Sequence, residues 1–253
     1  MRKSIIAGNW KMYKTPTESI NFVKELKEKV KKYNDRDVLI CPPFTSLYPV
    51  SEILKNSSIK LGAQNVYFEN EGAYTGEISP LMLKDIGVEY VICGHSERRN
   101  IFGETDKIIN KKVKKIVEND MKAILCVGEK LEEREKNLTF KVIENQIKNC
   151  LEGFDKLEKL LIAYEPVWAI GTGKTALPEQ AEEVHIFIRE LISKIYNKDI
   201  AENLIIMYGG SVKPENIDQL MEKENIDGVL VGGACLKIES FLRIIDYRSL
   251  YVK

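Results

Sequence analysis

The sequence predicts an α/β protein of the (β/α)8-barrel class. Three observations lead to this prediction: eight short apolar runs, helical patterns between them, and a length of 253 residues. The runs are nearly continuous in Val, Ile, Leu and small residues, which is typical of strands buried on both faces of a parallel sheet. Strands that alternate with helices form parallel βα units, and eight such units fill about 250 residues. A doubly wound open sheet is the alternative architecture.

The predicted strands are spread along the whole chain. They cover residues 4–11, 37–43, 59–66, 90–95, 122–129, 160–166, 204–210 and 228–234. No linker rich in Gly, Ser or Pro and no block of like charge divides the sequence. We therefore expect one domain over residues 1–253.

The stretches between the runs carry apolar residues at spacings of three and four, as amphipathic helices do. In the first stretch, Thr15 is a candidate N-cap, Pro16 takes the first helical position, and Glu18 completes a capping box. The apolar spacing recurs over residues 105–119 and 177–196. The sequence therefore predicts helices in the crossover positions of the barrel.

Composition points away from nucleic acid and membranes as partners. The chain has 38 basic and 38 acidic side chains, so it lacks the net charge that would attract a polyanion. No apolar run approaches the ~20 residues of a membrane helix, and the N-terminal run is too brief for a signal peptide. The five cysteines show no C-x-x-C spacing, which favours free thiols in a reducing cytoplasm over disulfides or a zinc site.

Polar residues stand where several predicted strands end. Asn9 and Lys11 follow the first run, Gln64 the third, His95 the fourth and Glu165 the sixth. Each alone is weak, because an Asn or Lys after a strand is usually loop chemistry. In a barrel, however, these positions meet at the C-terminal face, where the chemistry of such folds is found.

His95 is the stronger candidate of the two histidines. His185 lies in the middle of a predicted helix, where a packed or half-exposed residue is the simpler interpretation. His95 precedes a predicted helix start with Ser96 near the N-cap. The positive end of a helix dipole disfavours a charged imidazole, and a neutral ring can donate a hydrogen bond to an oxygen that gains negative charge.

Two glycine-rich turns close the last strands, at residues 209–211 and 232–233. The simpler interpretation is that these glycines only make tight βα turns. Glycines also let consecutive backbone N–H groups approach a ligand, and the loops after strands seven and eight of a barrel commonly bind phosphate. We favour a site for one phosphate group of a small molecule.

The stretch “AYEPVWAIGTGKT” (163–175) ends like a nucleotide-binding loop. A Walker A motif needs a glycine five positions before Gly173, and that position is Trp168. The motif therefore fails on spacing. An apolar segment after Pro166, followed by a glycine-rich exit, is instead typical of a lid that closes over a site.

The chain resembles the triosephosphate isomerase family over nearly its whole length. The matching segments are “AGNWKM” (7–12), “GAQNV” (62–66), “GAYTGEIS” (72–79), “VICGHSERR” (91–99), “CVGE” (126–129), “AYEPVWAIGTGKTA” (163–176), “YGGSVKPEN” (208–216) and “DGVLVGGACLK” (227–237). Several are long and specific, and they occur in the order of the family.

The resemblance implies a TIM barrel that interconverts dihydroxyacetone phosphate and D-glyceraldehyde 3-phosphate, a step of glycolysis and gluconeogenesis. It implies Glu165 as the base that moves a proton between two carbons and His95 as the neutral electrophile, the pairing known for this family. Lys11 would stabilise the enediolate electrostatically, and Asn9 would orient the substrate oxygens. Neither a cofactor nor a metal is implied.

The resemblance also assigns supporting positions. Ser96 and Glu97 match residues that surround the catalytic groups, and we expect Cys126, at a strand end, near Glu165. The remaining implied residues hold the phosphate or the lid over 166–176. They are the backbone N–H groups of Gly171, Ser211, Gly232 and Gly233, with Tyr208 and Ser211 as the latch of the closed lid.

The family is dimeric, so a homodimer is expected. The loop over 68–79 matches the family's protruding third loop, whose Thr75 would reach the partner near Asn9, Lys11 and His95. Cys235 departs from the family, which usually has Ser there, and we expect a weaker hydrogen bond and sensitivity to oxidation at an exposed helix end. The segment 246–253 runs past the usual ending and stays unassigned.

Two other functions remain as alternatives. One is an ATP-binding protein built on Gly173, Lys174 and Thr175, which the residue at position 168 disfavours. The other is a barrel that binds phosphosugars without turning them over, or an interaction scaffold. The presence of Asn9, Lys11, His95 and Glu165 together argues against it.

Overall fold

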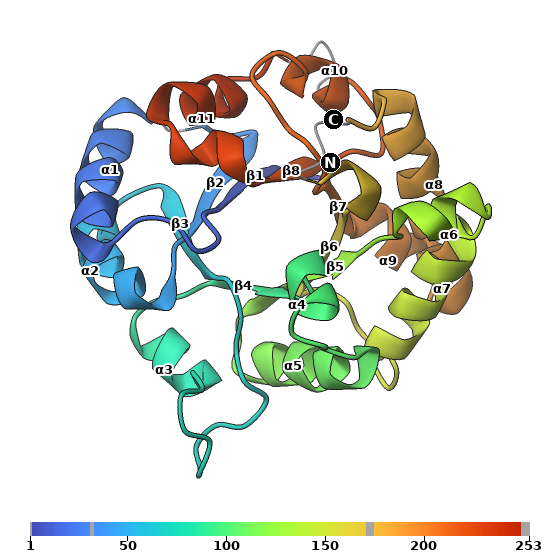
Figure 1. Cartoon of the computed structure of the whole chain (residues 1–253), viewed down its shortest axis with the longest axis horizontal. Coiled ribbons are helices and arrows are strands. Elements are labelled where there is room, and N and C mark those ends of the chain that lie inside the picture. Colours follow the sequence, from blue (N-terminus) through green and yellow to red (C-terminus); the bar gives the residue numbers. More distant parts are fainter. Residues whose placement is uncertain (1, 31–32, 171–174, 249–253) are drawn as a thin grey trace.

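The computed structural model describes residues 2–30, 33–170 and 175–248. Its strands close into a parallel barrel in the order β1 to β8, and β8 pairs with β1. Figure 1 shows the strands at the centre and the helices around them. This closure confirms the predicted (β/α)8 barrel and excludes the open sheet.

Each predicted strand is present. The bounds are β1 Ser4–Asn9, β2 Arg36–Cys41, β3 Ile59–Ala63, β4 Tyr90–Cys93, β5 Lys122–Val127, β6 Leu160–Tyr164, β7 Ile205–Tyr208 and β8 Gly228–Val231. The strands end before the predicted runs do; β1, for example, ends at Asn9 and the predicted run at residue 11. The residues beyond each strand turn into the loops that carry the polar candidates.

Helices fill the crossovers as predicted. Their bounds are α1 Pro16–Lys29, α2 Phe44–Leu54, α3 Pro80–Asp85, α4 Ser96–Asn100, α5 Asp106–Glu118, α6 Leu131–Glu135, α7 Thr139–Cys150, α8 Pro178–Ile195, α9 Lys198–Asn203, α10 Ile217–Met221 and α11 Ile238–Ile245, with 3₁₀ turns η1 Val167–Ala169 and η2 Gly233–Leu236. The capping box of α1 is formed: Thr15 Oγ1 accepts from the Glu18 N–H, and Glu18 Oε2 accepts from the Thr15 N–H.

Strand side chains alternate between two apolar clusters. One cluster fills the barrel interior, and its buried members include Ile5, Ala7, Leu161 and Ala163. The other lies between the strands and the helices, where Ile6 packs with the apolar faces of the helices. Burial on both faces explains why the runs read as continuously apolar.

Two further features of the architecture bear on function. The chain between β3 and α3 projects away from the barrel (Figure 1). Among the described residues, no helix has both the length and the apolar character needed to cross a bilayer.

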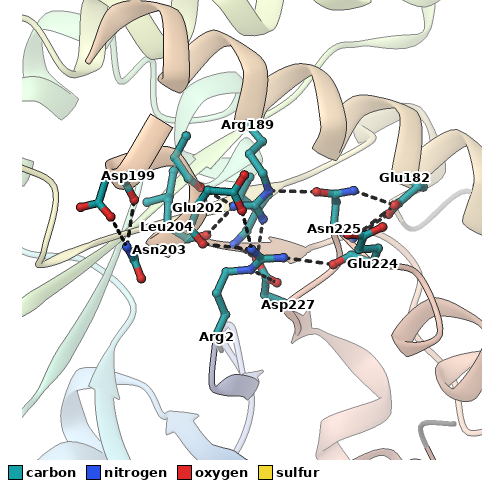
Figure 2. Close-up of polar contacts among 12 residues, drawn as sticks. Arg2, Glu182, Arg189, Asp199, Glu202, Asn203, Leu204, Glu224, Asn225 and Asp227 are labelled. Atoms are coloured by element: carbon teal, nitrogen blue, oxygen red, sulfur yellow. Dashed lines mark hydrogen bonds and ion pairs between the residues drawn. The ribbon is translucent and has the colours of Figure 1, made fainter. Parts of the chain in front are cut away.

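A buried ion network ties the N-terminal ends of the strands together. Asp227, just before β8, accepts hydrogen bonds from Arg2 Nε at 2.6 Å, from Arg189 Nη2 at 2.8 Å and from the Ile206 N–H at 2.9 Å. Figure 2 shows the two guanidinium groups on either side of this carboxylate. The network is at the end of the barrel opposite the candidate site and is structural.

Candidate active site

A cavity of about 410 Å³ lies at the C-terminal ends of the strands. The barrel places polar groups here because the strand alternation continues past the strand ends: Glu165 follows the interior residues Leu161 and Ala163, and Asn9 follows Ile5 and Ala7. The sequence-predicted residues that line the cavity are Asn9, Lys11, His95, Glu165, Ser211, Gly232 and Gly233. The fold therefore brings together residues that are up to 224 positions apart (9 to 233).

The Glu165 carboxylate is almost completely buried, with 2% of its surface exposed. Oε2 accepts a hydrogen bond from the Ser96 N–H at 2.8 Å. Oε1 lies 3.1 Å from His95 Nε2, but the angle does not fit a hydrogen bond, so among the described residues Oε1 is buried without a donor. One carboxylate oxygen is thus held in place, and the other remains available for a proton.

His95 is the N-cap residue of α4, and Ser96, predicted near the N-cap, is the first residue of the helix. Its Nδ1 accepts a hydrogen bond from the Glu97 N–H at 3.2 Å. The Glu97 carboxylate is farther from Nδ1, at 3.6 Å, beyond a hydrogen bond. An Nδ1 that accepts from an amide carries no proton, so we assign the ring proton to Nε2, which faces Glu165 and the cavity.

Lys11 is held in an unusual backbone conformation. Its φ of 52° lies in the left-handed region, which costs a non-glycine residue roughly 1–3 kcal/mol. The Lys11 N–H donates to Asn9 Oδ1 at 3.0 Å, and Gln64 Nε2 donates to the Lys11 carbonyl at 2.8 Å. Its Nζ lies 2.5 Å from Glu97 Oε1. These bonds fix the ammonium group at the rim of the cavity, beside Gly232.

The segment that follows Glu165 is tied to Glu129, a carboxylate with no exposed surface. Glu129 Oε1 accepts from Trp168 Nε1 at 3.0 Å and from Arg134 Nη1 at 3.0 Å, and the Tyr164 hydroxyl lies 3.2 Å away. Burial raises the pKa of Tyr164, and the Glu129 carboxylate raises it further. The start of the predicted lid is therefore anchored, whereas Gly171 and the rest of its glycine-rich exit over 171–174 lie outside the described residues.

Tyr208, the predicted latch, is buried at the end of β7. Burial raises its pKa to about 12, with a partial offset from the backbone amides of Ala176 and Ser211. These amides are near the hydroxyl, but not in hydrogen-bond geometry, because the oxygen has no hydrogen-bond partner among the described residues. The hydroxyl is thus close to the C-terminal end of the lid segment, at Ala176, and able to form new bonds.

Two cysteines adjoin the site. Cys126 is fully buried at the end of β5, and its pKa is raised by burial and by the neighbouring Glu165 carboxylate. The expectation of an exposed, oxidation-sensitive Cys235 is wrong. Its side chain has no exposed surface, its Sγ donates to the Asn9 carbonyl at 3.6 Å, and burial raises its pKa to about 12.

Thr75 does not lie in the cavity. It is exposed on the projecting loop between β3 and α3, in a short turn closed by Tyr74 and Glu77. Any role for Thr75 at a site therefore requires a second molecule.

Sequence reasoning left several site-supporting residues unassigned. Gln64 stands at a strand end, and nothing local in the sequence indicates its hydrogen bond to the Lys11 carbonyl. Glu129 ends the family segment “CVGE”, and nothing local indicates that its carboxylate is buried. No pattern in a single sequence marks Gln146, whose amide bonds both the N–H and the carbonyl of Gly128 from α7. Only the fold brings these partners together.

A second cavity, of about 480 Å³, lies at the opposite end of the barrel. The described residues that line it include Lys3, Tyr90 and Lys122, with no histidine among them. Within the described residues there is also no cluster of three or more His, Cys, Asp or Glu side chains that could hold a metal ion. The carboxylate–imidazole pair belongs to the cavity at the C-terminal ends.

Comparison with known proteins agrees with this geometry. A family model described as triosephosphate isomerase matches residues 4–248. Curated relatives of that name include proteins from Carboxydothermus hydrogenoformans (58% identical, covering 97% of this chain and 98% of the relative), Dictyoglomus turgidum (55%, 97% and 99%) and Clostridium botulinum strain Langeland (56%, 98% and 100%). The chain belongs to the triosephosphate isomerase family.

Proposed function

We propose that Glu165 and His95 carry out the isomerisation of dihydroxyacetone phosphate and D-glyceraldehyde 3-phosphate in the cavity described above. The family and the names of the relatives give the enzyme class, an intramolecular aldose–ketose isomerase. The single observation that supports these residue roles best is the contact between His95 Nε2 and Glu165 Oε1 at 3.1 Å inside that cavity.

In the proposed reaction Glu165 removes a proton from the carbon next to the ketone of the substrate. The electron pair of that C–H bond forms a carbon–carbon double bond, and the carbonyl oxygen takes up negative charge. His95 Nε2–H donates a hydrogen bond to this oxygen. The hydroxyl proton on the first carbon then passes to the former ketone oxygen, which becomes an alcohol. Glu165 returns its proton to the carbon that carried the ketone, the electron pair of the double bond forms this C–H bond, and the aldehyde forms where the alcohol had been.

The geometry also suggests what substrate binding changes. In the structure described, Glu165 Oε1 occupies the space in front of His95 Nε2, and Oε2 is held by the Ser96 N–H. A substrate oxygen that accepts from His95 takes the place of Oε1, so the carboxylate moves relative to the ring when substrate binds. The Lys11 ammonium and the glycine-rich turns at 209–211 and 232–233 hold the phosphate and its charge at the cavity mouth.

A lid is chemically necessary for this reaction, because an enediolate phosphate exposed to water loses its phosphate. We propose that residues 166–176 close over the cavity and bond Tyr208 and Ser211. Support comes from the anchored start of this segment at Glu129 and from the Tyr208 hydroxyl beside Ala176 and Ser211.

We further propose a homodimer with the projecting loop over 68–79 as the contact. Large apolar side chains are exposed on the segments that follow β1, β3 and β4, which is unusual for a surface that faces water. They include Met12, Tyr13, Tyr74, Met82, Ile101 and Phe102. A cytoplasmic location is supported by the cysteines at 41, 93, 126, 150 and 235, which are all free thiols. The balanced charge supports a small-molecule substrate and no nucleic acid.

A coupled assay on the purified protein tests the function, and Glu165→Gln tests the base. The variant keeps the size of the side chain and its acceptor oxygen but cannot take a proton. We expect kcat to fall by at least about 10³-fold with an unchanged circular dichroism spectrum, because general base catalysis contributes about 10²–10⁴-fold. Near-normal turnover in the variant would refute the base, and a wild-type protein that binds the triose phosphate without isomerising it would favour a binding role.

A further inference from the structure

We propose that Arg99 is a positioning residue for the reaction, one that aligns His95 and Glu165 through the backbone that carries them. The proposal rests on the function given above. Arg99 lies in α4, outside the substrate cavity, with 14% of its side chain exposed. Because Arg99 does not line the substrate cavity, its charge does not act directly on the substrate, and another role has to explain its fixed position.

The guanidinium joins the ends of two neighbouring strands. Its Nε donates to the Gly94 carbonyl at 2.7 Å, and its Nη2 donates to the Cys126 carbonyl at 3.1 Å. Gly94 follows β4 and directly precedes His95. Cys126 is the second-last residue of β5, and its thiol is next to the Glu165 carboxylate. One planar group thus sets the spacing between the backbone of the electrophile and the backbone beside the base.

The Gly94 backbone is shaped to receive this group. Its φ is +68°, in the left-handed region, and a Cβ atom there would lie 3.0 Å from Arg99 Nη2. A side chain at this position would therefore be strained and would press against the guanidinium. The conformation turns the Gly94 carbonyl toward Arg99 and directs the chain into the N-cap position of His95.

The guanidinium is itself anchored from a third element. Asp106 Oδ1, in the first turn of α5, accepts from Arg99 Nη1 at 2.6 Å. The same carboxylate accepts from the Cys150 thiol at 3.3 Å and, through Oδ2, from Asn149 Nδ2 at 3.2 Å. The charge of Arg99 is therefore neutralised away from Glu165, and the fork geometry leaves Nε and Nη2 for the two carbonyls.

Arg99 also borders a cavity of about 220 Å³ behind the base. Ser96, Cys126 and Glu165 line the same cavity. If the guanidinium is replaced by a single ammonium group, one point donor cannot reproduce the planar fork that bonds Gly94, Cys126 and Asp106, and the space behind Glu165 widens. We expect the carboxylate and the imidazole to lose their alignment while the contacts to phosphate, on the other side of the barrel mouth, stay intact.

The test compares Arg99→Lys with a matched buried arginine, Arg189→Lys. Arg189 also donates to two backbone carbonyls, those of Ala201 and Leu204, and to a carboxylate, but at the far end of the barrel (Figure 2). For Arg99→Lys we expect kcat to fall about 10- to 100-fold with KM within about threefold, since a misplacement near 1 Å can cost 10²-fold. For Arg189→Lys we expect lower thermal stability and kcat within about twofold of the wild type.

A second readout separates positioning from stability. The protein has only two histidines, so ¹⁵N-histidine NMR reports two rings. His185 Nδ1 lies 3.0 Å from the Asn225 carbonyl, and Arg189 Nε donates to Asn225 Oδ1. We expect Arg99→Lys to shift the ring nitrogens of His95 and not those of His185, and Arg189→Lys to do the reverse.

Each outcome decides the proposal. A folded Arg99→Lys protein with unchanged kcat and unchanged His95 resonances overturns it, as does an equal loss of kcat in both variants. If Arg99→Lys does not fold, Asp106→Asn replaces it as the test variant, because this change weakens the bond between Arg99 Nη1 and residue 106 and leaves the guanidinium in place. We expect kcat of Asp106→Asn to fall about 3- to 10-fold. If the wild type does not isomerise triose phosphate, the proposed function fails, and the His95 shifts still decide the positioning.

Discussion

The locations of Glu165 and Asn9 follow from the alternation of the strand that precedes each. His95 has the parity of the outward-facing Val91 and Cys93 and turns into the cavity after Gly94, whose φ is +68°. Glu165 continues the interior series of β6, and Asn9 continues that of β1. The residue types that face the cavity could therefore be predicted once the strands were identified. What holds them could not be predicted, because the Ser96 N–H, Gln64 and Arg99 reach the site only through tertiary contacts.

Cys235 illustrates a residue whose chemistry depends on burial. Burial raises its pKa from the ordinary 9.0 to about 12, so the folded state keeps a proton that the unfolded state releases. The contribution of Cys235 to stability is fully present below pH 9 and is lost as the pH rises from 9 to 12. We expect the free energy of unfolding to fall with pH over this range more steeply in the wild type than in Cys235→Ser, by up to about 1.4 kcal/mol per pH unit.

Urea unfolding at pH 8, 9 and 10 measures this difference. Lysines and tyrosines titrate in both proteins, so they cancel when the two curves are subtracted. Parallel pH dependence in the two proteins would show that the thiol is not shielded in the folded state.

At the scale of elements, strands and the larger helices could be predicted, and the short elements of the site could not. The long apolar runs and the capping box of α1 are local signals, and both are confirmed. The helix α4, which His95 caps, has five residues. The 3₁₀ turn η1, which follows Glu165, has three. Segments this short have too few residues for a periodic pattern, and hydrogen bonds to distant groups determine their shape.

The junction between β5 and β6 gives a direct test of how closely these elements must approach. A Cβ atom on Gly128 would lie 1.7 Å from the Glu165 carbonyl oxygen, and the Gln146 amide holds both backbone groups of Gly128. In Gly128→Ala the backbone of Glu165 has to shift. We therefore expect kcat to fall by about 10²-fold, together with a loss of stability.

Gly87→Ala is the matched control for this variant. Gly87 has a φ of +78° and open space around it, so an alanine there is strained but contacts nothing. We expect it to lower stability by about 1 kcal/mol and to leave kcat unchanged. If Gly128→Ala keeps wild-type kcat, the close approach of the two strand ends does not position the base.

At the scale of the whole molecule, the proposed dimer would give a role to the projecting loop over 68–79 and to the exposed apolar side chains of the segments that follow β1, β3 and β4. Thr75 is exposed on this loop, and the sequence-based assignment of a role at the partner's site remains a prediction. The proposed dimer joins these features, since it covers the apolar side chains and brings Thr75 to a second cavity.

Thr75→Arg tests this arrangement. A long charged side chain fits poorly at a closely packed contact, and we expect the dimer to weaken at least tenfold, which is about 1.4 kcal/mol. Sedimentation velocity over a concentration series, with activity measured in parallel, follows the change. Glu190→Arg on the exposed face of α8 is the control, and we expect it to behave as the wild type. A wild-type protein that sediments as a monomer at all concentrations and is fully active would contradict the dimer.

We propose that a carboxylate and an uncharged imidazole at one end of the barrel move a proton between adjacent carbons. Isomerisation of dihydroxyacetone phosphate in D₂O, followed by ¹H NMR, measures that proton most directly. We predict that product formed by the wild type carries deuterium at the carbon next to the aldehyde, because a carboxylic acid exchanges its proton with solvent, and that Glu165→Gln forms almost no product. Product that forms at the enzymatic rate without deuterium at that carbon, or labelled product formed equally fast by Glu165→Gln, would contradict the account.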